Sequence, residues 1–539
     1  MTDFSLIRDP WVPLTSGGRR VEVSLLDALT RAHEFDGLAL DEPLQCVALL
    51  RQVLLPVVWD ALGLPRDEEE WAARWDAERL DVDRLDGYLT EHAERFELFH
   101  PTQPFGQVAG LRTDKDETKP VSLMLPSVAT GNNVPLFAAR TEAEPPALSP
   151  ARAARALLAV HCWDTAAIKS GAVGDPQVRA GKTTGNPTGP VGQLGVIVPM
   201  GRTLAETLLL NTPIVRQGLR PGDRPQWRAE PASPKWVSRP AKGLLDLLTW
   251  QSRRIRLVPS VDDGGAPAVR QVVLAAGDRL DQTPLFEPHT AWKQVDKPKA
   301  GQPPRRSVRH QPGRSAWRGM SGLLATHQQT EERVSSSLLL AQVAVLRGED
   351  IVPPDLPLQV LTVGVAYGNQ SAVVEDMMVD VIPLPVAALA TDGQVRGLLL
   401  DVVAQADGLR EAANHLGDDL RRATGGEKMP WDKGQRLGDA LVHEFTPVIR
   451  RLLAGLQRQP DLGDQAEAAW RQTARRLAMD AAEPVLAAAP PEAFLGRQES
   501  EKVVFRLSVA EARFRSAVNR ILGINTGTGS DPVRAHTGV

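Results

Sequence analysis

The run Gly181-Lys182-Thr183 combines residue types that hold nucleotide phosphates in phosphate-binding loops. Such a loop needs a further glycine five residues before the glycine that precedes the lysine, and it opens a helix. That earlier position holds Pro176, which has no N–H to donate, and Thr184-Gly185-Asn186-Pro187 cannot continue a helix. The spacing therefore argues against an NTPase site and against a need for ATP.

Metal ligation and nucleophilic catalysis have equally little support in the sequence. The ten histidines include no His-Glu-x-x-His motif, and His161 fits a helix face better than a ligand set. Cys46 and Cys162 are too few for a disulfide scaffold or a four-cysteine zinc site, so we expect both to be buried as small apolar residues. We expect no catalytic residue, metal or cofactor, which favours a binding protein.

Two loops carry polar groups that suit a nucleic acid. Seven glycines lie between Gly171 and Gly195, and Lys169, Arg179 and Lys182 accompany them. At this glycine density we expect a long loop without regular elements. Backbone N–H groups that no side chain obstructs can approach phosphates or a narrow groove closely. The alternative interpretation is an ordinary surface loop.

The second loop is the run Gly368-Asn369-Gln370-Ser371-Ala372, which separates two apolar β-branched stretches, Val360–Val363 and Val379–Ile382. These stretches predict two strands joined by a tight turn. A turn that presents side-chain amides could insert between base pairs and occupy their hydrogen-bonding edges. The alternative interpretation is a β-turn with no role beyond joining the strands.

The net charge of −4 hides a marked asymmetry along the chain. Residues 1–100 hold 10 Arg, no Lys and 21 acidic residues, whereas residues 214–318 hold 20 basic and 9 acidic residues. The basic block is densest at its end, where Trp292 and Trp317 flank the cations and 297–318 reads as an exposed, mobile loop. Cations beside exposed aromatic rings suit a phosphate backbone with unpaired bases, although a solvated linker is the alternative. The basic candidates for DNA contact are Lys293, Lys297, Lys299, Arg305, Arg306 and Arg309.

The elements that must position these loops indicate an α+β fold. Ser24 and Asp27 form a capping box, helices are expected over 44–62, with an interruption near Pro56, and over 151–166, and residues 213–260 look mostly irregular. From about residue 385, apolar residues recur at helical spacing in four segments, the last from Val503, which predicts a four-helix bundle. We expect a large irregular mixed domain over 1–384, the bundle over 385–524 and a flexible tail over 525–539. No membrane-length apolar run or signal peptide is apparent, and two cysteines fit the cytoplasm.

The opening residues Phe4–Leu14, followed by Ser24–Leu29, resemble those of the CasA family, the large subunits of the type I-E CRISPR surveillance complex Cascade. The likeness continues in order along the chain. It includes the run from Leu125 to Phe137, the glycine loop, Pro288-His289-Thr290 and the Asn369-Gln370-Ser371 turn. The resemblance implies an irregular N-terminal domain followed by a helical bundle.

This resemblance implies a function on DNA. The subunit would recognise a protospacer-adjacent motif (PAM) in double-stranded DNA through the minor groove and wedge the duplex open to start an R-loop. It would also help to recruit the helicase–nuclease effector. The implied partners are the other Cascade subunits, the CRISPR guide RNA, the target DNA and that effector. The competing hypotheses are a stand-alone nucleic-acid enzyme, such as a nuclease or NTPase, and a purely architectural subunit.

The resemblance also assigns roles to residues of this sequence. The loop near the guide RNA carries over to Asn132, Asn133 and Phe137, and the basic minor-groove residue to Arg279. The DNA-reading loop and the wedge carry over to Gly181, Lys182, Thr183, Thr184 and Gly185, and to Asn369, Gln370, Ser371 and Ala372. Lys182 departs from the family pattern, and the inserted wedge side chain is either Gln370 or Ser371. Some relatives have a paired-cysteine motif that this chain lacks.

Overall fold

The computed structural model describes residues 3–128, 146–298, 301–325, 334–390, 393–427, 436–500 and 503–524. The chain forms two compact units, residues 1–390 and residues 391–539. The sequence places the boundary six residues earlier, between 384 and 385; the difference is the short 3₁₀ turn Val386–Leu389, which packs with the first unit. Mixed strands and helices in the first unit and helices in the second confirm the α+β fold class.

The first unit begins with a small sheet and a capped helix. Strands β1 (Val12–Ser16) and β2 (Arg19–Val23) form a hairpin, and β3 (Gly37–Leu38) pairs with the other edge of β1. Ser24 caps α1 (Leu25–Thr30): its Oγ accepts from the Asp27 N–H and donates to the Asp27 carboxylate. The N-cap expected at Ser24 is confirmed, and the Asp27 side chain reaches back to the Ser24 hydroxyl. Two acidic helices follow, α4 (Glu68–Asp76) and α5 (Val82–Glu91).

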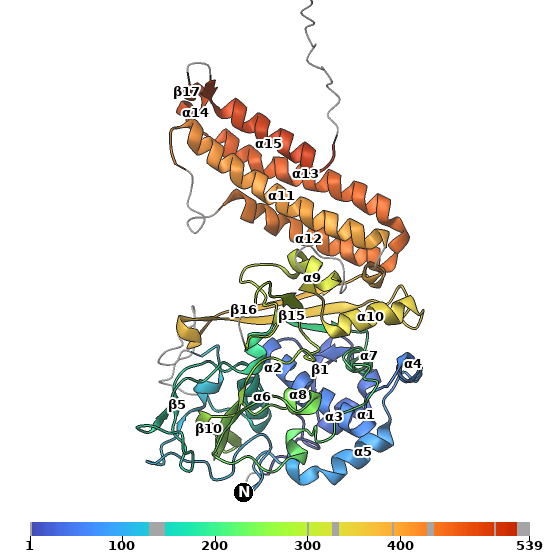
Figure 1. Cartoon of the computed structure of the whole chain (residues 1–539), viewed down its shortest axis with the longest axis vertical. Coiled ribbons are helices and arrows are strands. Elements are labelled where there is room, and N and C mark those ends of the chain that lie inside the picture. The colour runs from blue at the N-terminus through green and yellow to red at the C-terminus, as the bar shows by residue number, and fades with distance from the viewer. Residues whose placement is uncertain are drawn as a thin grey trace, which may run out of the picture. The chain divides into compact units, whose positions relative to one another are not determined.

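Apolar helices fill the centre of this unit (Figure 1). Helices α2 (Pro43–Leu49) and α3 (Leu55–Leu62) are joined by a π-helical turn over Leu50–Leu54, so the expected interruption precedes Pro56. Among the described residues, Pro43–Leu62 is the one segment apolar and long enough to cross a membrane, but 83% of its apolar window is buried, as in a core helix. Helix α6 (Pro150–Trp163) packs against α2.

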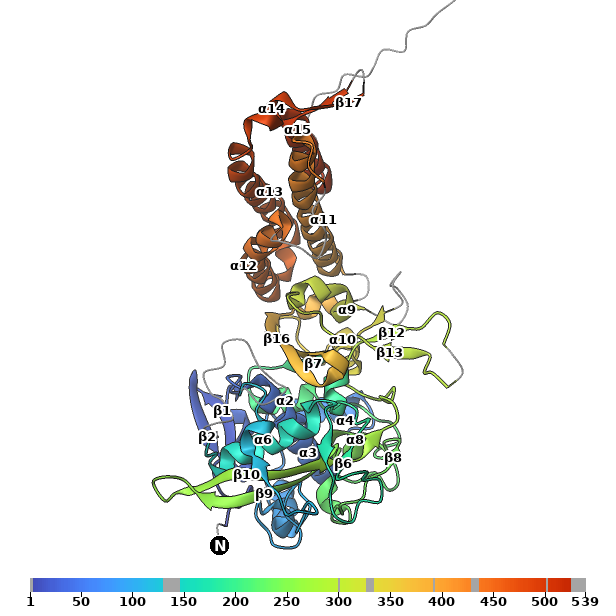
Figure 2. The same ribbon diagram turned by 90° about the vertical axis from the view of Figure 1, so that its left-hand side faces the viewer.

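The glycine-rich and arginine-rich regions contain more regular structure than their composition predicts. Strands β9 (Arg253–Val261) and β10 (Pro267–Ala276) form a long hairpin inside 213–260 and beyond, visible at the lower edge of Figure 2. Strand β10 also pairs with β4 (Lys119–Pro120) and β5 (Lys169–Ser170), and β5 pairs with β6 (Lys182–Thr183). The prediction that the glycine loop lacks regular elements is therefore wrong: β6 lies within the loop, and β5, at its start, pairs with the distant strand β10. Residues 213–260 are mostly irregular, as expected, apart from β9 and a few short elements. Shorter elements nearby are α7 (Leu204–Leu210), β8 (Ser238–Arg239), α8 (Leu244–Leu248) and β11 (Arg279–Leu280).

Two further sheets complete the first unit. Strand β15 (Gln359–Gly368) lies between β7 (Val196–Met200) and β16 (Val373–Pro383), so the hairpin expected over 358–384 is confirmed. Strand β12 (Trp292–Gln294) lies between β13 (Arg305–Ser307) and β14 (Val334–Ser335). The region 297–318 is thus partly a strand rather than a mobile loop. Helices α9 (Met320–Leu324) and α10 (Leu338–Gly348) lie beside these sheets.

The second unit consists of four long helices packed side by side (Figure 1). They are α11 (Gln394–Ala423), α12 (Leu437–Arg458), α13 (Gly463–Ala487) and α15 (Leu507–Ile521). Phe445 and Trp470 meet edge to face in their core, with ring centroids 5.3 Å apart. Val503, expected in the fourth helix, instead lies in β18 (Val503–Phe505), which pairs with β17 (Arg497–Ser500) after the short helix α14 (Pro491–Leu495). The tail 525–539 lies outside the described residues.

Candidate nucleic-acid interface

The turn between β15 and β16 holds three successive residues in a left-handed backbone conformation. Asn369, Gln370 and Ser371 have φ of 27°, 56° and 59°, and none of them is a glycine. Each such residue costs on the order of 1 kcal/mol or more, and strained residues of this kind concentrate at functional sites. The Ala372 N–H closes the turn on the Asn369 carbonyl at 3.1 Å, and the Ser371 carbonyl accepts from the Ala166 N–H at 2.8 Å. The turn is therefore anchored through the backbone of Ser371 to Ala166, and its backbone is strained at Asn369, Gln370 and Ser371.

The side chains at this apex are free to meet a ligand. The side chains of Asn369 and Gln370 are exposed and make no hydrogen bond to another described residue, whereas Ser371 and Ala372 are half-buried. Of the two candidates for the inserted side chain, the geometry favours Gln370, because the Ser371 backbone is tied to the body of the protein.

The glycine loop presents only part of the set expected from the sequence. Lys182, Thr184 and Gly185 are exposed, but Thr183 is 3% exposed because it lies opposite Lys169 in the β5–β6 pair. Thr183 is therefore not a contact residue in this conformation. Gly185 has φ of +65°, a conformation that favours glycine.

Arg279 lies directly beside this loop. Its Nη2 donates to the Thr184 carbonyl at 2.9 Å and to Asn186 Oδ1 at 3.4 Å, while the guanidinium stacks on the Trp236 ring, 3.9 Å from the centroid. A Cβ at Gly185 would lie 4.0 Å from Arg279 Nη1, so a larger side chain there would begin to cover that nitrogen. Burial, and then the nearby Arg253 charge, lower the Arg279 pKa, although arginine remains charged. The family resemblance singled out Arg279; nothing in the sequence pointed to Trp236.

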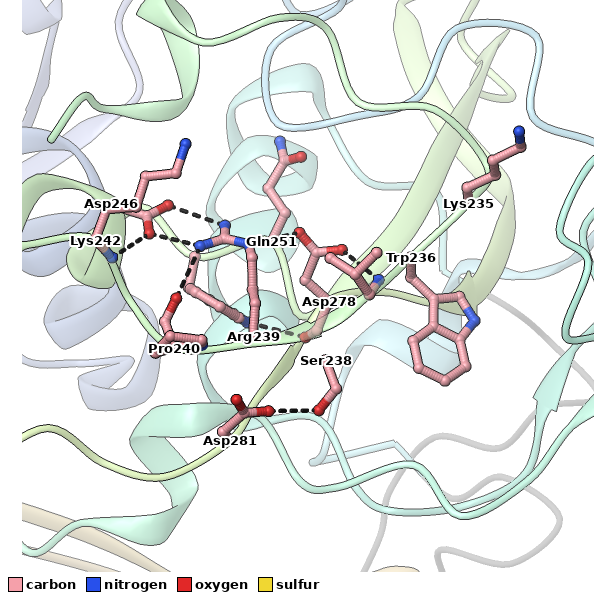
Figure 3. Close-up of polar contacts among 12 residues, drawn as sticks. Lys235, Trp236, Ser238, Arg239, Pro240, Lys242, Asp246, Gln251, Asp278 and Asp281 are labelled. Carbon is pink, nitrogen blue, oxygen red and sulfur yellow. Dashed lines mark hydrogen bonds and ion pairs between the residues drawn. The ribbon is translucent and has the colours of Figure 1, made fainter. Parts of the chain in front are cut away.

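An ion-pair network holds the strand that carries Arg279 (Figure 3). Arg239 on β8 contacts the Asp246 carboxylate at 2.6 Å and the Asp278 carboxylate at 3.6 Å, and β8 pairs in parallel with β11. Ser238 donates to Asp281 at 2.6 Å on the other side of Arg279 in the chain. This network fixes the backbone around Arg279 and engages Arg239, one of the cations of the basic block.

Beneath both loops lies a buried charged cluster that sequence reasoning missed. Asp164 contacts Lys169 Nζ at 2.7 Å and the Arg253 guanidinium, and all three side chains are at most 9% exposed. Burial opposes ionisation of Asp164, but the two cations outweigh it and lower its pKa. Burial also lowers the Lys169 pKa. The interpretation of Lys169 as a loop cation for phosphates is wrong, because Asp164 and burial engage it.

The β12–β13 hairpin carries the basic candidates that do face solvent. Lys293 lies directly opposite Arg306 in the strand pair, and like charges in that position destabilise a hairpin. Arg305 and Arg306 are exposed, and within the described part of the chain they have no ion-pair partner. Lys297 is also exposed. Arg309 is exposed too, but its guanidinium donates to both the backbone carbonyl and the side-chain carbonyl of Gln193. A surface of this kind suits a polyanion.

The expected stacking partners on this hairpin are absent. Trp292 is 4% and Trp317 0% exposed, so neither ring can stack on a base in this conformation, and the prediction of aromatic interleaving is wrong. Both rings are buried core residues. Lys299 and the guide-RNA candidates Asn132, Asn133 and Phe137 lie outside the described residues.

Contacts along the chain join these features into one surface. Asn186, beside Arg279, donates to the Ala167 carbonyl at 3.4 Å, and the neighbouring Ala166 binds the turn at Ser371. At the other end of the glycine loop, the Gly195 N–H donates to the carbonyl of Val308, the residue after β13. We call the β12–β13 hairpin the basic hairpin. The strained turn, the glycine loop with Arg279 and the basic hairpin are thus neighbours, although roughly 200 residues of sequence separate the first from the second.

The two cysteines and His161, the residues whose side chains could be reactive, are all buried. Cys46 and Cys162 are buried, as expected, and burial raises the pKa of each thiol to about 12. His161 is buried on α6 with Nε2 2.9 Å from the Gly106 carbonyl, and burial lowers its pKa to about 4. Among the described residues, no three His, Cys, Asp or Glu side chains gather in a way that could hold a metal ion.

Comparisons with known proteins agree on one family. Residues 5–481 match the family model of the CRISPR-associated protein Cse1. A CasA/Cse1 protein of Thermus thermophilus is 30% identical over 506 residues, covering 89% of this chain and 91% of the relative. The crystal structure of Thermobifida fusca Cse1 superposes with a TM-score of 0.83 at 32% identity, covering 97% of this chain and 99% of that one.

The fold also occurs within an assembly. A chain in a structure described as a CRISPR RNA-guided surveillance complex superposes with a TM-score of 0.69 at 20% identity, covering 96% of this chain and 100% of that one. At this identity the likeness concerns the fold alone.

Proposed function

Because this chain belongs to the CRISPR-associated Cse1 (CasA) family, we propose that it is the large subunit of a type I-E CRISPR RNA-guided surveillance complex. Its partners are the other protein subunits of the complex, the guide RNA and double-stranded target DNA, in the cytoplasm. In this proposal the subunit recognises the protospacer-adjacent motif and starts the R-loop. It also helps to recruit the helicase–nuclease effector, and it carries out no covalent chemistry itself.

Motif recognition falls to the glycine loop and Arg279. Exposed Thr184 and Gly185 and the Arg279 guanidinium lie beside one another, with Arg279 bonded to the Thr184 carbonyl, which gives a narrow cationic edge suited to the minor groove. Minor-groove readout distinguishes mainly A·T from G·C pairs. The subunit is therefore expected to accept several related motifs.

Duplex opening falls to the strained turn, and this turn is the observation that carries the proposal. Replacing a DNA duplex by an RNA–DNA hybrid is nearly balanced in free energy, so the difficult step is the first opened pair. Unstacking that step costs a few kcal/mol before any hybrid forms. An exposed Gln370 on a turn that is already strained and anchored fills the opened step without needing to reorganise.

Arg279→Ala is expected to weaken binding of the assembled complex to a motif-bearing duplex about tenfold and to reduce discrimination between motifs. The reason is that this change removes the cation beside Gly185 and its bond to the Thr184 carbonyl. The measurement is a titration of guide-matched duplexes that differ only in the motif. Arg270→Ala is the matched control, since Arg270 pairs with the exposed Asp263 on the β9–β10 hairpin. Equal motif preference in wild type and Arg279→Ala would contradict the assignment.

Binding of target DNA is expected to weaken steeply with salt, because the basic hairpin releases counterions from phosphates. Replacing Arg305 and Arg306 by glutamine should reduce the slope of log affinity against log salt by about 1 to 2. The control is Arg202→Gln, an exposed arginine in an ion pair with Glu206. An unchanged slope in the Arg305/Arg306 variant would remove the hairpin from the DNA path.

Two competing functions make different predictions in simple experiments. A stand-alone nucleic-acid enzyme would cleave DNA or hydrolyse ATP as a purified subunit. A purely architectural subunit would leave binding of the complex unchanged when the motif beside a matched target is swapped. The proposed function instead predicts loss of binding on that swap, without cleavage by the isolated subunit.

A further inference from the structure

The segment from Trp163 to Ala167, which begins at the last residue of α6, is bonded to the strained turn on one of its sides. The Tyr367 hydroxyl donates to the Trp163 carbonyl at 2.6 Å, and the Ala166 N–H donates to the Ser371 carbonyl at 2.8 Å. These two bonds hold the end of β15 and the turn itself. Moving the turn away from this segment would therefore break these bonds.

The same segment is bonded to the glycine loop on its other side. The Gly189 N–H donates to the Asp164 carbonyl at 2.8 Å. Arg253 on β9 bonds to both the segment and the loop: its Nη2 donates to the Thr165 carbonyl and to the Pro187 carbonyl, each at 2.8 Å. One guanidinium thus joins the segment that anchors the turn to the loop that carries Thr184 and Gly185.

The Arg253 side chain is fixed by its surroundings as well as by these two carbonyls. Its side chain is 1% exposed, its Nε donates to the Asp164 carboxylate, and its Nη1 donates to the Ser252 carbonyl at 2.7 Å. Lys169 also pairs with Asp164, at 2.7 Å. A planar guanidinium that makes four such bonds holds two backbones at one separation, which the single ammonium of a lysine cannot do.

We propose that Arg253, oriented by Asp164, is a positioning residue that sets the distance between the motif-reading loop and the duplex-opening turn. DNA is then opened at one fixed step from the motif. This inference rests on the proposed function, since it concerns how the two loops act together. It assigns no DNA contact to Arg253, which is buried beneath both loops.

The test uses the fully assembled complex and two types of guide-matched duplex. Each type is prepared with the fluorescent base 2-aminopurine at the first, the second or the third pair beside the motif, so that the signal reports which pair opens. One duplex is fully paired, and the other has mismatches at the first two pairs. Arg253→Lys keeps the charge next to Asp164 but loses the fork to both carbonyls. We expect it to open the paired duplex about tenfold more slowly, to spread the signal beyond the first pair, and to regain wild-type R-loop formation on the mismatched duplex.

Arg155→Lys is the matched control. Arg155 is also a buried arginine, 5% exposed, that donates to a carbonyl, that of Trp11, and pairs with a carboxylate, that of Glu22, but neither of these bonds involves the two loops. If the Arg253→Lys complex opens the paired duplex at the wild-type rate and at the same base pair as wild type, the proposal is overturned. An equal loss on paired and mismatched duplexes also overturns it, since that would indicate general damage to the subunit.

A variant of the turn separates failure of this inference from failure of the proposed function. If the Asn369→Ala/Gln370→Ala variant opens the paired duplex normally, the turn does not open DNA and the proposed function fails. If that variant is slow while Arg253→Lys resembles wild type, only the positioning role of Arg253 fails.

Discussion

Replacing Asn369 and Gln370 together by alanine is expected to slow opening of fully paired target DNA about tenfold to a hundredfold. The reason is that alanine fills too little of the unstacked step to offset the few kcal/mol of lost stacking. The anchoring bonds of the turn come from the backbone of Ser371 and Ala372, so the fold of the hairpin is retained. Assembly of the complex is expected to be unchanged.

The measurement is R-loop formation on linear target DNA by complexes assembled with each variant. Gln459→Ala/Gln498→Ala is the matched control, because both of these amide side chains are exposed and lie in the helical unit. A negatively supercoiled target should partly restore the rate of the turn variant, since supercoiling supplies opening free energy. Wild-type rates on linear DNA would reject the turn as the opening element.

Glu287→Gln is expected to destabilise the first unit by about 3–5 kcal/mol, a larger loss of stability than any surface substitution should cause. Glu287 binds Arg51 with both oxygens, at 2.7 and 2.8 Å, and both side chains are at most 2% exposed. Arg51 Nη1 also donates to His289 Nδ1 at 2.6 Å. Removing the Glu287 charge leaves a buried guanidinium without a counter-charge in the core.

The measurement is the shift in the urea midpoint of the purified chain. The double variant Arg51→Met/Glu287→Leu should lose less stability than Glu287→Gln, because apolar replacement of a whole buried pair is often tolerated. Arg20→Gln is the surface control and should change stability by less than about 1 kcal/mol, since Arg20 and Glu22 are both partly exposed. A double variant that is less stable than the single variant would contradict the account.

Local patterns predicted the elements that depend on neighbouring residues. The Ser24–Asp27 capping box, the hairpin around Asn369 and the long helices of the second unit follow from side-chain chemistry and periodicity within a few turns. The prediction of Arg279 came from the family resemblance, and the structure places it beside Gly185. Which DNA atoms it contacts stays a prediction.

Long-range partners could not be predicted in the same way. Asp164 and Arg253 are 89 residues apart, and neither belongs to a motif, so only the fold brings them together. The same holds for β4 and β5, which both pair with β10 from a distant part of the chain. Glycine density and proline content therefore overstated the irregular part of the chain.

Counting charged residues along the sequence overestimated the basic surface for a related reason. The excess of cations in 214–318 suggests a basic surface, yet Arg228, Arg239, Arg253 and Arg254 are each paired with an aspartate. The exposed cations of the short hairpin, Lys297, Arg305 and Arg306, remain available to a polyanion. Asp60 and Asp164 come from other segments, so the asymmetry along the sequence is partly cancelled in the folded unit.

The most direct test of the opening mechanism is cross-linking from the apex of the turn to the first base pair beside the motif. Because Cys46 and Cys162 are buried, Gln370→Cys introduces the one exposed thiol of the described chain. With a thiol-tethered base placed at successive pairs of the target, the assembled complex is expected to form a disulfide at the first pair beside the motif and not at pairs within the motif duplex. Cross-links spread evenly along the DNA, or none at the first pair while the R-loop still forms, would contradict the claim that this turn opens the duplex.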